Sequence, residues 1–195
     1  MPDQINGYSY GWPEAGRSPV SITDLQELKQ TVGWTDEDTK WIKSAGTIFA
    51  PRAEAMVDHW RSIIAQQPHL LRWFLTPEGK PDENYKAAVK KRFVQWVRDT
   101  CEREYDQSWL DYQHEIALRH TPAKKNVTDG GHTPPLVPLR YVIAFAEIIG
   151  QSARDFLLEA KCGRKELEAM HGAWRKSVLL QVALWSRAYV QADLW

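Results

Sequence analysis

Two histidines, His114 and His120, lie six positions apart in the segment LDYQHEIALRH, and histidine is a common metal ligand in proteins. On a helix, six residues turn the chain to positions about 120° apart around the axis, so the two rings face different directions. They cannot chelate one ion together. The sequence also contains no HExxH motif and no Cys/His cluster with zinc spacing. A metal bound by this segment would therefore have one histidine ligand and not two.

His120 is the better candidate because Pro122 must end its helix, which puts the ring in the last turn. Free carbonyl groups in that turn can accept the second ring N–H. Such a hydrogen bond fixes the tautomer and makes the other ring nitrogen a good ligand. The competing interpretation is a helix C-terminal histidine stabilised by the helix dipole. Taken alone, the position of His120 leaves both interpretations open.

Composition excludes several classes of partner. The chain has 195 residues with 25 basic and 25 acidic side chains, so bulk charge predicts neither a nucleic-acid nor a membrane partner. Cys101 and Cys162 are too far apart for a CxxC site, and the N-terminus lacks the features of a signal peptide. No phosphate-cradling loop points to a kinase or a dehydrogenase. We expect a cytoplasmic protein.

Ten tryptophans are many for a chain of this length. Each one buries a large area and brings an N–H group that needs a partner. The plain interpretation is an aromatic-rich core, and the sharper one is a core packed around a flat, apolar, non-protein group.

Apolar residues recur with helical spacing almost throughout, which predicts an all-α fold. A leader over 1–20 precedes a short helix over 21–32. The later helices are predicted over 35–46, 51–67, 83–102, from Asp106 to before Pro122, over 139–160 and over 164–190. Neither an internal repeat nor a domain boundary is visible, so we expect residues 1–195 to form one domain.

Seven segments of the chain resemble the protoglobins, single-domain haem proteins related to the sensor domains of globin-coupled sensors. They are INGYSYG, PHLLRWF, KKRFVQW, YDQSWLDYQHEIALRH, KKNVTDG, PLRYVIAF and LQVALWS. The resemblance implies a globin fold with an extra N-terminal helix over 21–32, and a leader that helps to bury haem b. It also implies homodimers built on the two C-terminal helices, and no attached output domain.

In that family the histidine that closes the ALRH motif is the proximal iron ligand, which is His120 here. The residues expected to contact the haem are Trp60, Phe74, Phe93, Val142, Phe145 and Ile149, and of these Trp60, Phe93 and Phe145 match the family's distal pocket. Plain core packing is the competing interpretation for each. Arg92, Arg140 and Lys91 are candidate partners of the haem propionates, or else members of a solvated face.

Arg61 departs from the family, which usually has a tyrosine after the distal tryptophan. An unpaired guanidinium above iron would be costly to bury. Arg61 can therefore turn toward a propionate, Asp58 or solvent, which leaves the distal pocket without a polar donor. Alternatively, it can point inward when an anion such as nitrite is bound. We favour the first arrangement.

Three functions remain open. The leading prediction is a haem protein that binds O2, CO or NO at an open iron site, as a scavenger, carrier or sensor rather than an enzyme. The second is a haem enzyme acting on nitrite, peroxynitrite or peroxide, although no distal histidine and arginine of peroxidase spacing is visible. The third is a helical interaction domain without a cofactor, which ten tryptophans fit poorly.

Overall fold

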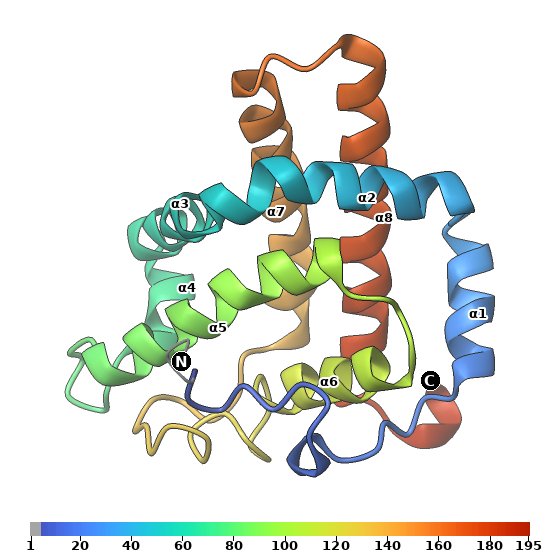
Figure 1. The fold of residues 1–195 in the computed structure, drawn as a ribbon. Helices are drawn as coiled ribbons and strands as arrows, with labels where there is room; N and C mark the ends of the chain where they lie inside the picture. The colour runs from blue at the N-terminus through green and yellow to red at the C-terminus, as the bar shows by residue number, and fades with distance from the viewer. Residues whose placement is uncertain (1–4) are drawn as a thin grey trace.

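Helices are the only extended regular elements in residues 5–195, the range that this computed structural model describes (Figure 1). The first four residues of the predicted leader lie outside that range. The elements are η1 (Pro13–Ala15), α1 (Ile22–Thr31), α2 (Asp36–Phe49), η2 (Ala50–Arg52), α3 (Ala53–Gln66), α4 (Pro68–Leu71), η3 (Arg72–Phe74), α5 (Glu83–Glu102), α6 (Gln107–Leu118), α7 (Leu139–Glu159), α8 (Arg164–Ser186) and η4 (Ala192–Leu194). The all-α prediction is confirmed.

Side-chain caps explain where several helices begin. Ser21 and Thr35 each form a reciprocal capping box with an aspartate three residues later, at the start of α1 and α2. Asp82 and Asp106 accept a backbone N–H at the start of α5 and α6. These caps can be read from the sequence, and the predicted helix starts agree with the structure closely.

Two helix ends differ from the prediction. The second helix was expected to end near Gly46, but α2 continues to Phe49 because Gly46 lies against Cys101 of α5 rather than in a turn. The last helix was expected to reach Val190, but α8 ends at Ser186. Beyond it, Tyr189 donates to the carbonyl oxygen of Val137 at 2.8 Å, a contact with the connection between α6 and α7. In both places a tertiary contact, rather than the local sequence, decides where the helix ends.

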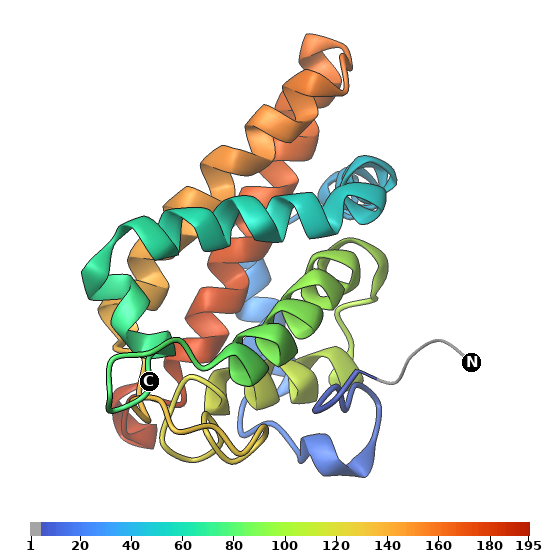
Figure 2. The same ribbon diagram turned by 90° about the vertical axis from the view of Figure 1, so that its left-hand side faces the viewer.

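The two longest helices, α7 and α8, run side by side, and α2 crosses them while α5 and α6 pack below it (Figures 1 and 2). The helix α3 continues from α2 toward the far side of α7, and the corner formed by α4 and η3 returns the chain to α5. The end of α6 therefore faces the space between α5, α7 and the corner. Within the described range, no helix is long and apolar enough to cross a membrane.

Tryptophans from three helices meet in the core. The Trp96 ring of α5 lies 6.2 Å from Trp60 of α3, and 5.7 Å and 6.1 Å from Trp174 and Trp185 of α8, measured between ring centres. Their indole N–H groups have polar partners, for example Gln181 for Trp96 at 2.6 Å. Paired aromatic rings contribute about 0.5–1.5 kcal/mol each beyond their buried area. This cluster fixes how α3, α5 and α8 sit against one another.

The crossing of α2 and α5 leads to a prediction. A Cβ atom at Gly46 would lie 2.8 Å from Cβ of Cys101, whereas one at Gly172 of α8 would meet nothing within 4 Å. Gly46→Ala should therefore lower the free energy of unfolding by about 1–3 kcal/mol through overpacking. Gly172→Ala should raise it by about 0.5–1 kcal/mol through helix propensity. Urea unfolding of the two variants measures both, and equal effects would contradict the close crossing.

Candidate functional site

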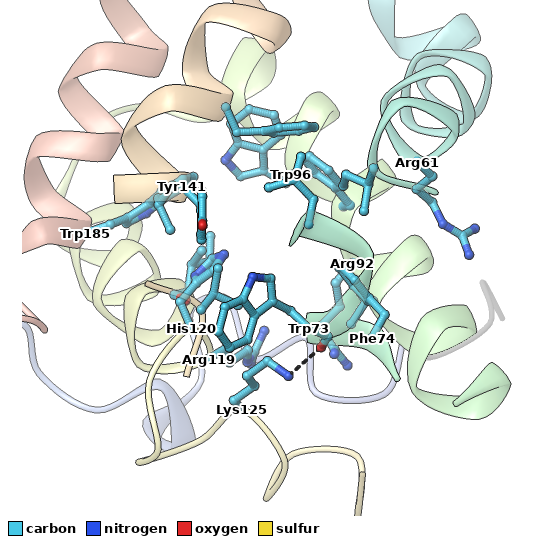
Figure 3. Close-up of a pocket in the computed structure, with 18 of the residues that line it drawn as sticks. Arg61, Trp73, Phe74, Arg92, Trp96, Arg119, His120, Lys125, Tyr141 and Trp185 are labelled. Atoms are coloured by element: carbon cyan, nitrogen blue, oxygen red, sulfur yellow. Dashed lines mark hydrogen bonds between the residues drawn. The ribbon is translucent and has the colours of Figure 1, made fainter. Parts of the chain in front are cut away.

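A cavity of about 230 Å³ lies between α3, α5, α6, α7 and the corner at η3 (Figure 3). Its walls are mainly aromatic and aliphatic. It brings together most of the residues predicted for the site: Arg61, Phe74, Arg92, Phe93, His120, Val142, Phe145 and Ile149. These side chains come from five elements spread over the chain, so the tertiary structure assembles the site.

Trp60 is not part of the cavity wall, although it was predicted to contact the cofactor and the distal ligand. Its side chain is fully buried, and its ring lies 5.0 Å from Phe93, which does line the cavity. Its indole N–H donates to Ser152 of α7. Trp60 therefore supports Phe93 from behind. The helix pattern placed Trp60 on the inner face of α3 correctly, but could not separate a wall residue from the layer beneath it.

The basic residues predicted to bind the haem propionates also divide into one that lines the cavity and two that do not. Arg92 lines the cavity, whereas Lys91 and Arg140 are exposed and lie outside it. The guanidinium of Arg140 instead covers the ring of Tyr141 at 4.7 Å. Of the three basic residues proposed as propionate partners, only Arg92 reaches the cavity.

Several cavity residues were not predicted as site residues. Trp73 was seen only as part of a corner, and Lys125 only as part of the KKNVTDG motif. Arg119 precedes His120 in the ALRH motif and also lines the cavity. A lysine or arginine in a polar loop normally indicates a solvated position, so the sequence carries no signal for their burial.

His120 lies one residue beyond the capping position of α6, and its backbone N–H donates to Ala117 at 3.0 Å. Its ring atom Nδ1 donates to the carbonyl oxygen of Ile116 at 2.9 Å, since a carbonyl can only accept. This hydrogen bond leaves Nε2 as the nitrogen with a free lone pair. The ring stacks on Trp185, 5.8 Å between centres, and borders the cavity (Figure 3).

The surroundings keep the imidazole of His120 neutral. Burial lowers its pKa, and the positive charges of Lys125 and Arg119 lower it further, against the opposing effect of the hydrogen bond to Ile116. A neutral imidazole with one free nitrogen is the form that binds metals. Among residues 5–195, no group of three or more His, Cys, Asp or Glu side chains could hold a metal ion by itself. His120 could therefore supply a single imidazole ligand to a metal that is otherwise held by another group.

Arg61 borders the cavity, but its guanidinium points away from the interior (Figure 3). It lies 3.8 Å from the carboxylate of Asp58, one turn earlier on α3, and the side chain is 30% exposed. The structure therefore has the first of the two arrangements considered for this residue.

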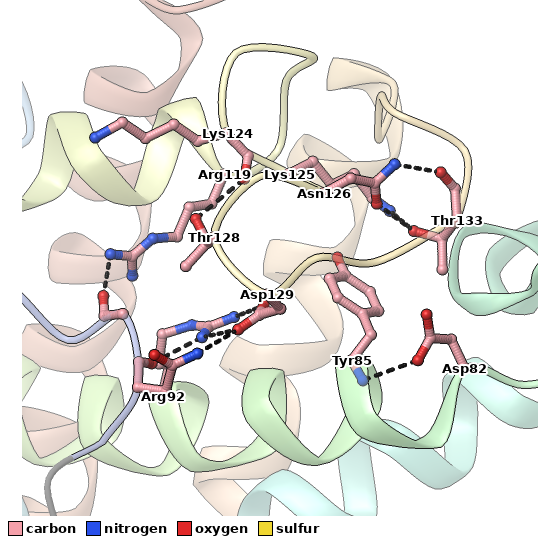
Figure 4. Close-up of polar contacts among 12 residues, drawn as sticks. Asp82, Tyr85, Arg92, Arg119, Lys124, Lys125, Asn126, Thr128, Asp129 and Thr133 are labelled. Carbon is pink, nitrogen blue, oxygen red and sulfur yellow. Dashed lines mark hydrogen bonds and ion pairs between the residues drawn. The ribbon is translucent and has the colours of Figure 1, made fainter.

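Two further arginines, Arg92 and Arg119, border the cavity, and each already holds a carboxylate. Figure 4 shows the pair of Arg92 with Asp129. Arg92 binds Asp129 through two nitrogens, at 2.8 Å and 2.6 Å. Arg119 contacts Glu115 at 3.0 Å. Arg92 is therefore neutralised by Asp129, whereas Arg119 shares Glu115 with Lys124, whose ammonium binds the same carboxylate at 2.5 Å.

Lys125 differs from both arginines. The residue is only 2% exposed, and its ammonium group donates to the carbonyl oxygen of Trp73 at 3.0 Å and to the hydroxyl of Thr133 at 2.5 Å. It also lies 4.7 Å from the centre of the Tyr85 ring. Within the described chain, no carboxylate lies within 4.0 Å of the ammonium nitrogen. Burial lowers the pKa of Lys125 to about 8, and distant Asp82 offsets this only in part.

The leader is fastened to the same two arginines. Arg92 donates to the carbonyl oxygen of Asn6 at 2.9 Å, and Arg119 donates to that of Gly7. Gly7 has a positive φ of 72°, and a Cβ atom there would lie 2.5 Å from Cγ2 of Thr128. The leader thus runs along the polar edge of the cavity, where only glycine fits between Arg92 and the loop after α6.

The helical topology and a single histidine facing an apolar cavity define the class of protein as a globin. The globin domain of the Geobacter sulfurreducens globin-coupled sensor matches with a TM-score of 0.64 and 16% identity, over 85% of this chain and 97% of that one. The protoglobin family model matches residues 22–195, so the chain belongs to the protoglobin family. The extra N-terminal helix is α1. No curated protein sequence matches significantly. Globins as a family generally bind haem.

The leader contact predicts unequal effects at two glycines. Gly7 and Gly11 share a φ of 72°, but a Cβ atom at Gly11 meets nothing within 4 Å. Both alanine variants carry the backbone strain, about 1 kcal/mol, whereas only Gly7→Ala also clashes with Thr128. Hydrogen exchange of the Tyr8 amide, which bonds to Ile5, should accelerate much more in Gly7→Ala than in Gly11→Ala. Matching rates would contradict the tight passage.

The depressed pKa of Lys125 predicts a pH dependence of stability. The folded pKa of about 8 lies below the ordinary 10.5, so the folding penalty is complete below pH 8 and is lost as the pH rises toward 10.5. Between pH 7.5 and 9.5, the wild-type protein should gain about 1 kcal/mol of unfolding free energy relative to Lys125→Met. Urea unfolding of both proteins at the two pH values measures this difference. A constant difference would mean that Lys125 titrates normally.

Proposed function

We propose that the protein is a haem globin that binds diatomic gases, with His120 as the proximal ligand of the iron. The observation that carries the proposal is the His120 ring, held neutral with its Nε2 lone pair free at the wall of an apolar cavity. Membership of the protoglobin family supports it independently.

The cavity residues fit a haem in three respects. Aromatic and branched side chains such as Phe74, Phe93 and Val142 suit the faces of a flat apolar ring. One imidazole nitrogen suits the iron. Buried donors suit carboxylates: the indole N–H of Trp73, which lines the cavity, has no hydrogen-bond partner among residues 5–195.

When bound, a haem supplies iron with an open coordination position at which O2, CO or NO binds. His120 orients its ring through Ile116, and its neutral form supplies the lone pair. Phe93, backed by Trp60, and Phe145 exclude water from the cavity. Arg61 faces Asp58, so within the described chain the cavity has no histidine and arginine pair of the peroxidase type. This supports gas binding over peroxide turnover.

We also propose that residues 1–195 form one domain and that two copies of the chain pair through α7 and α8. Exposed Ile143, Leu158 and Leu179 on these two helices support that pairing. The gas-bound protein would act as a carrier, scavenger or sensor in the cytoplasm.

Replacement of His120 tests the proposed iron ligand. His120→Ala should abolish the haem absorption spectrum or lower haem affinity at least 10-fold, and added imidazole should restore a ligand-bound spectrum. His114→Ala is the matched control, because His114 lies on the same helix but outside the cavity. Visible spectra of the ferric, reduced and CO forms measure this. A wild-type spectrum in His120→Ala would refute the assignment.

Replacement of Arg61 tests whether its guanidinium contacts a gas molecule bound to the iron. Because Arg61 faces Asp58, Arg61→Ala should change the O2 and CO dissociation rates less than about threefold. A hydrogen bond from Arg61 to the bound ligand would contribute about 1–1.5 kcal/mol, and its loss would speed O2 release about 10-fold. Stopped-flow ligand displacement distinguishes the two. Tenfold faster O2 release would show that Arg61 turns inward.

A further inference from the structure

The cavity has an imbalance of charge on its polar side. Arg92 and Arg119 already hold Asp129 and Glu115. Lys125 has only two uncharged acceptors, the carbonyl oxygen of Trp73 and the hydroxyl of Thr133. An ammonium group has three donors, and beyond these two acceptors Lys125 has only the face of the Tyr85 ring, 4.7 Å from its nitrogen.

A buried ammonium without a carboxylate is costly, because burial removes its hydration and nothing of opposite charge replaces it. Proteins usually avoid such a residue, or pair it. Lys125 lines the cavity, as does Trp73, whose indole N–H is also unpartnered (Figure 3). The ammonium of Lys125, the indole N–H of Trp73 and the unpartnered Nε–H of Arg119 all border the cavity, and they point to an acceptor that enters it and carries negative charge.

We propose that Lys125 binds a propionate carboxylate of the haem, with the indole N–H of Trp73 as a second donor to that carboxylate. This inference rests on the proposed function and adds the residues that recognise the acidic edge of the cofactor. Arg92, the expected partner, is bidentate to Asp129 and would have to break that pair first. Lys125 has no ion pair to break before it binds a carboxylate.

The competing explanation makes Lys125 a structural tie. Its ammonium joins the corner at Trp73 to the loop at Thr133, and both contacts stabilise the protein without any ligand. If Lys125 has only this structural role, the protein should bind a porphyrin equally well with or without free carboxylates. If Lys125 binds a propionate, the protein should bind haem more tightly than a haem whose carboxylates are masked.

The test compares haem with its dimethyl ester, which has the same ring and iron but no free carboxylates. Transfer of each porphyrin from the protein to an excess of a haem-acceptor protein gives its dissociation rate. Wild-type protein should release the ester at least 10-fold faster than haem. Lys125→Met should release haem about as fast as the ester, while the rate for the ester stays within about threefold of wild type.

Lys91→Met is the matched control, because Lys91 is basic but exposed and outside the cavity. It should release both porphyrins as wild type does. If wild-type protein distinguishes the two porphyrins but Lys125→Met distinguishes them equally well, another residue binds the propionates and the proposal is overturned. The comparison of the two porphyrins in wild-type protein does not depend on any variant being able to fold. If wild-type protein releases both porphyrins at the same rate, the proposal is also overturned.

The outcomes separate this inference from the proposed function. If the wild-type protein takes up neither porphyrin, the haem globin assignment itself fails. If it binds both through His120 but without preference, the assignment stands and only the role of Lys125 is lost.

Discussion

The hydrogen bond from Nδ1 of His120 to the carbonyl oxygen of Ile116 is the interaction on which the chemistry of the cavity depends. The same carbonyl, in the last turn of α6, also accepts the backbone N–H of Arg119 at 3.2 Å, so the end of the helix itself orients the ring. It also selects the tautomer in which Nε2 is unprotonated. Without it, the imidazole could rotate or present an N–H to the cavity, and the cavity would lose the free lone pair of Nε2.

The aromatic core holds this arrangement in place. Trp185 of α8 stacks on His120 and donates to Gln113 of α6, at 2.9 Å, which ties the two helices together beside the ring. On the other side, Trp60 and Trp96 pack against Phe93 and fix the inner wall. The same tryptophans therefore close the core and shape the cavity.

The polar edge of the cavity is held together by ion pairs and hydrogen bonds rather than by aromatic packing. Arg92 and Arg119 neutralise two acidic side chains and also hold the carbonyl groups of Asn6 and Gly7, so the leader and the cavity share their anchors. Lys125 remains as an unneutralised charge in a buried place. The local folding cost of such a group is tolerable where function requires a donor for an incoming anion.

Most of the helices, several of their caps and the position of His120 at the end of α6 could be predicted from the sequence, because these depend on residues within one or two turns of each other. The motifs also indicated the family. The folded chain was needed to show that Trp60 lies behind Phe93 and that Arg61 faces Asp58. It was also needed to show that Lys125 is buried at the cavity while Lys91 and Arg140 are exposed. Burial and charge pairing depend on contacts between segments far apart in the chain, and no local pattern records them.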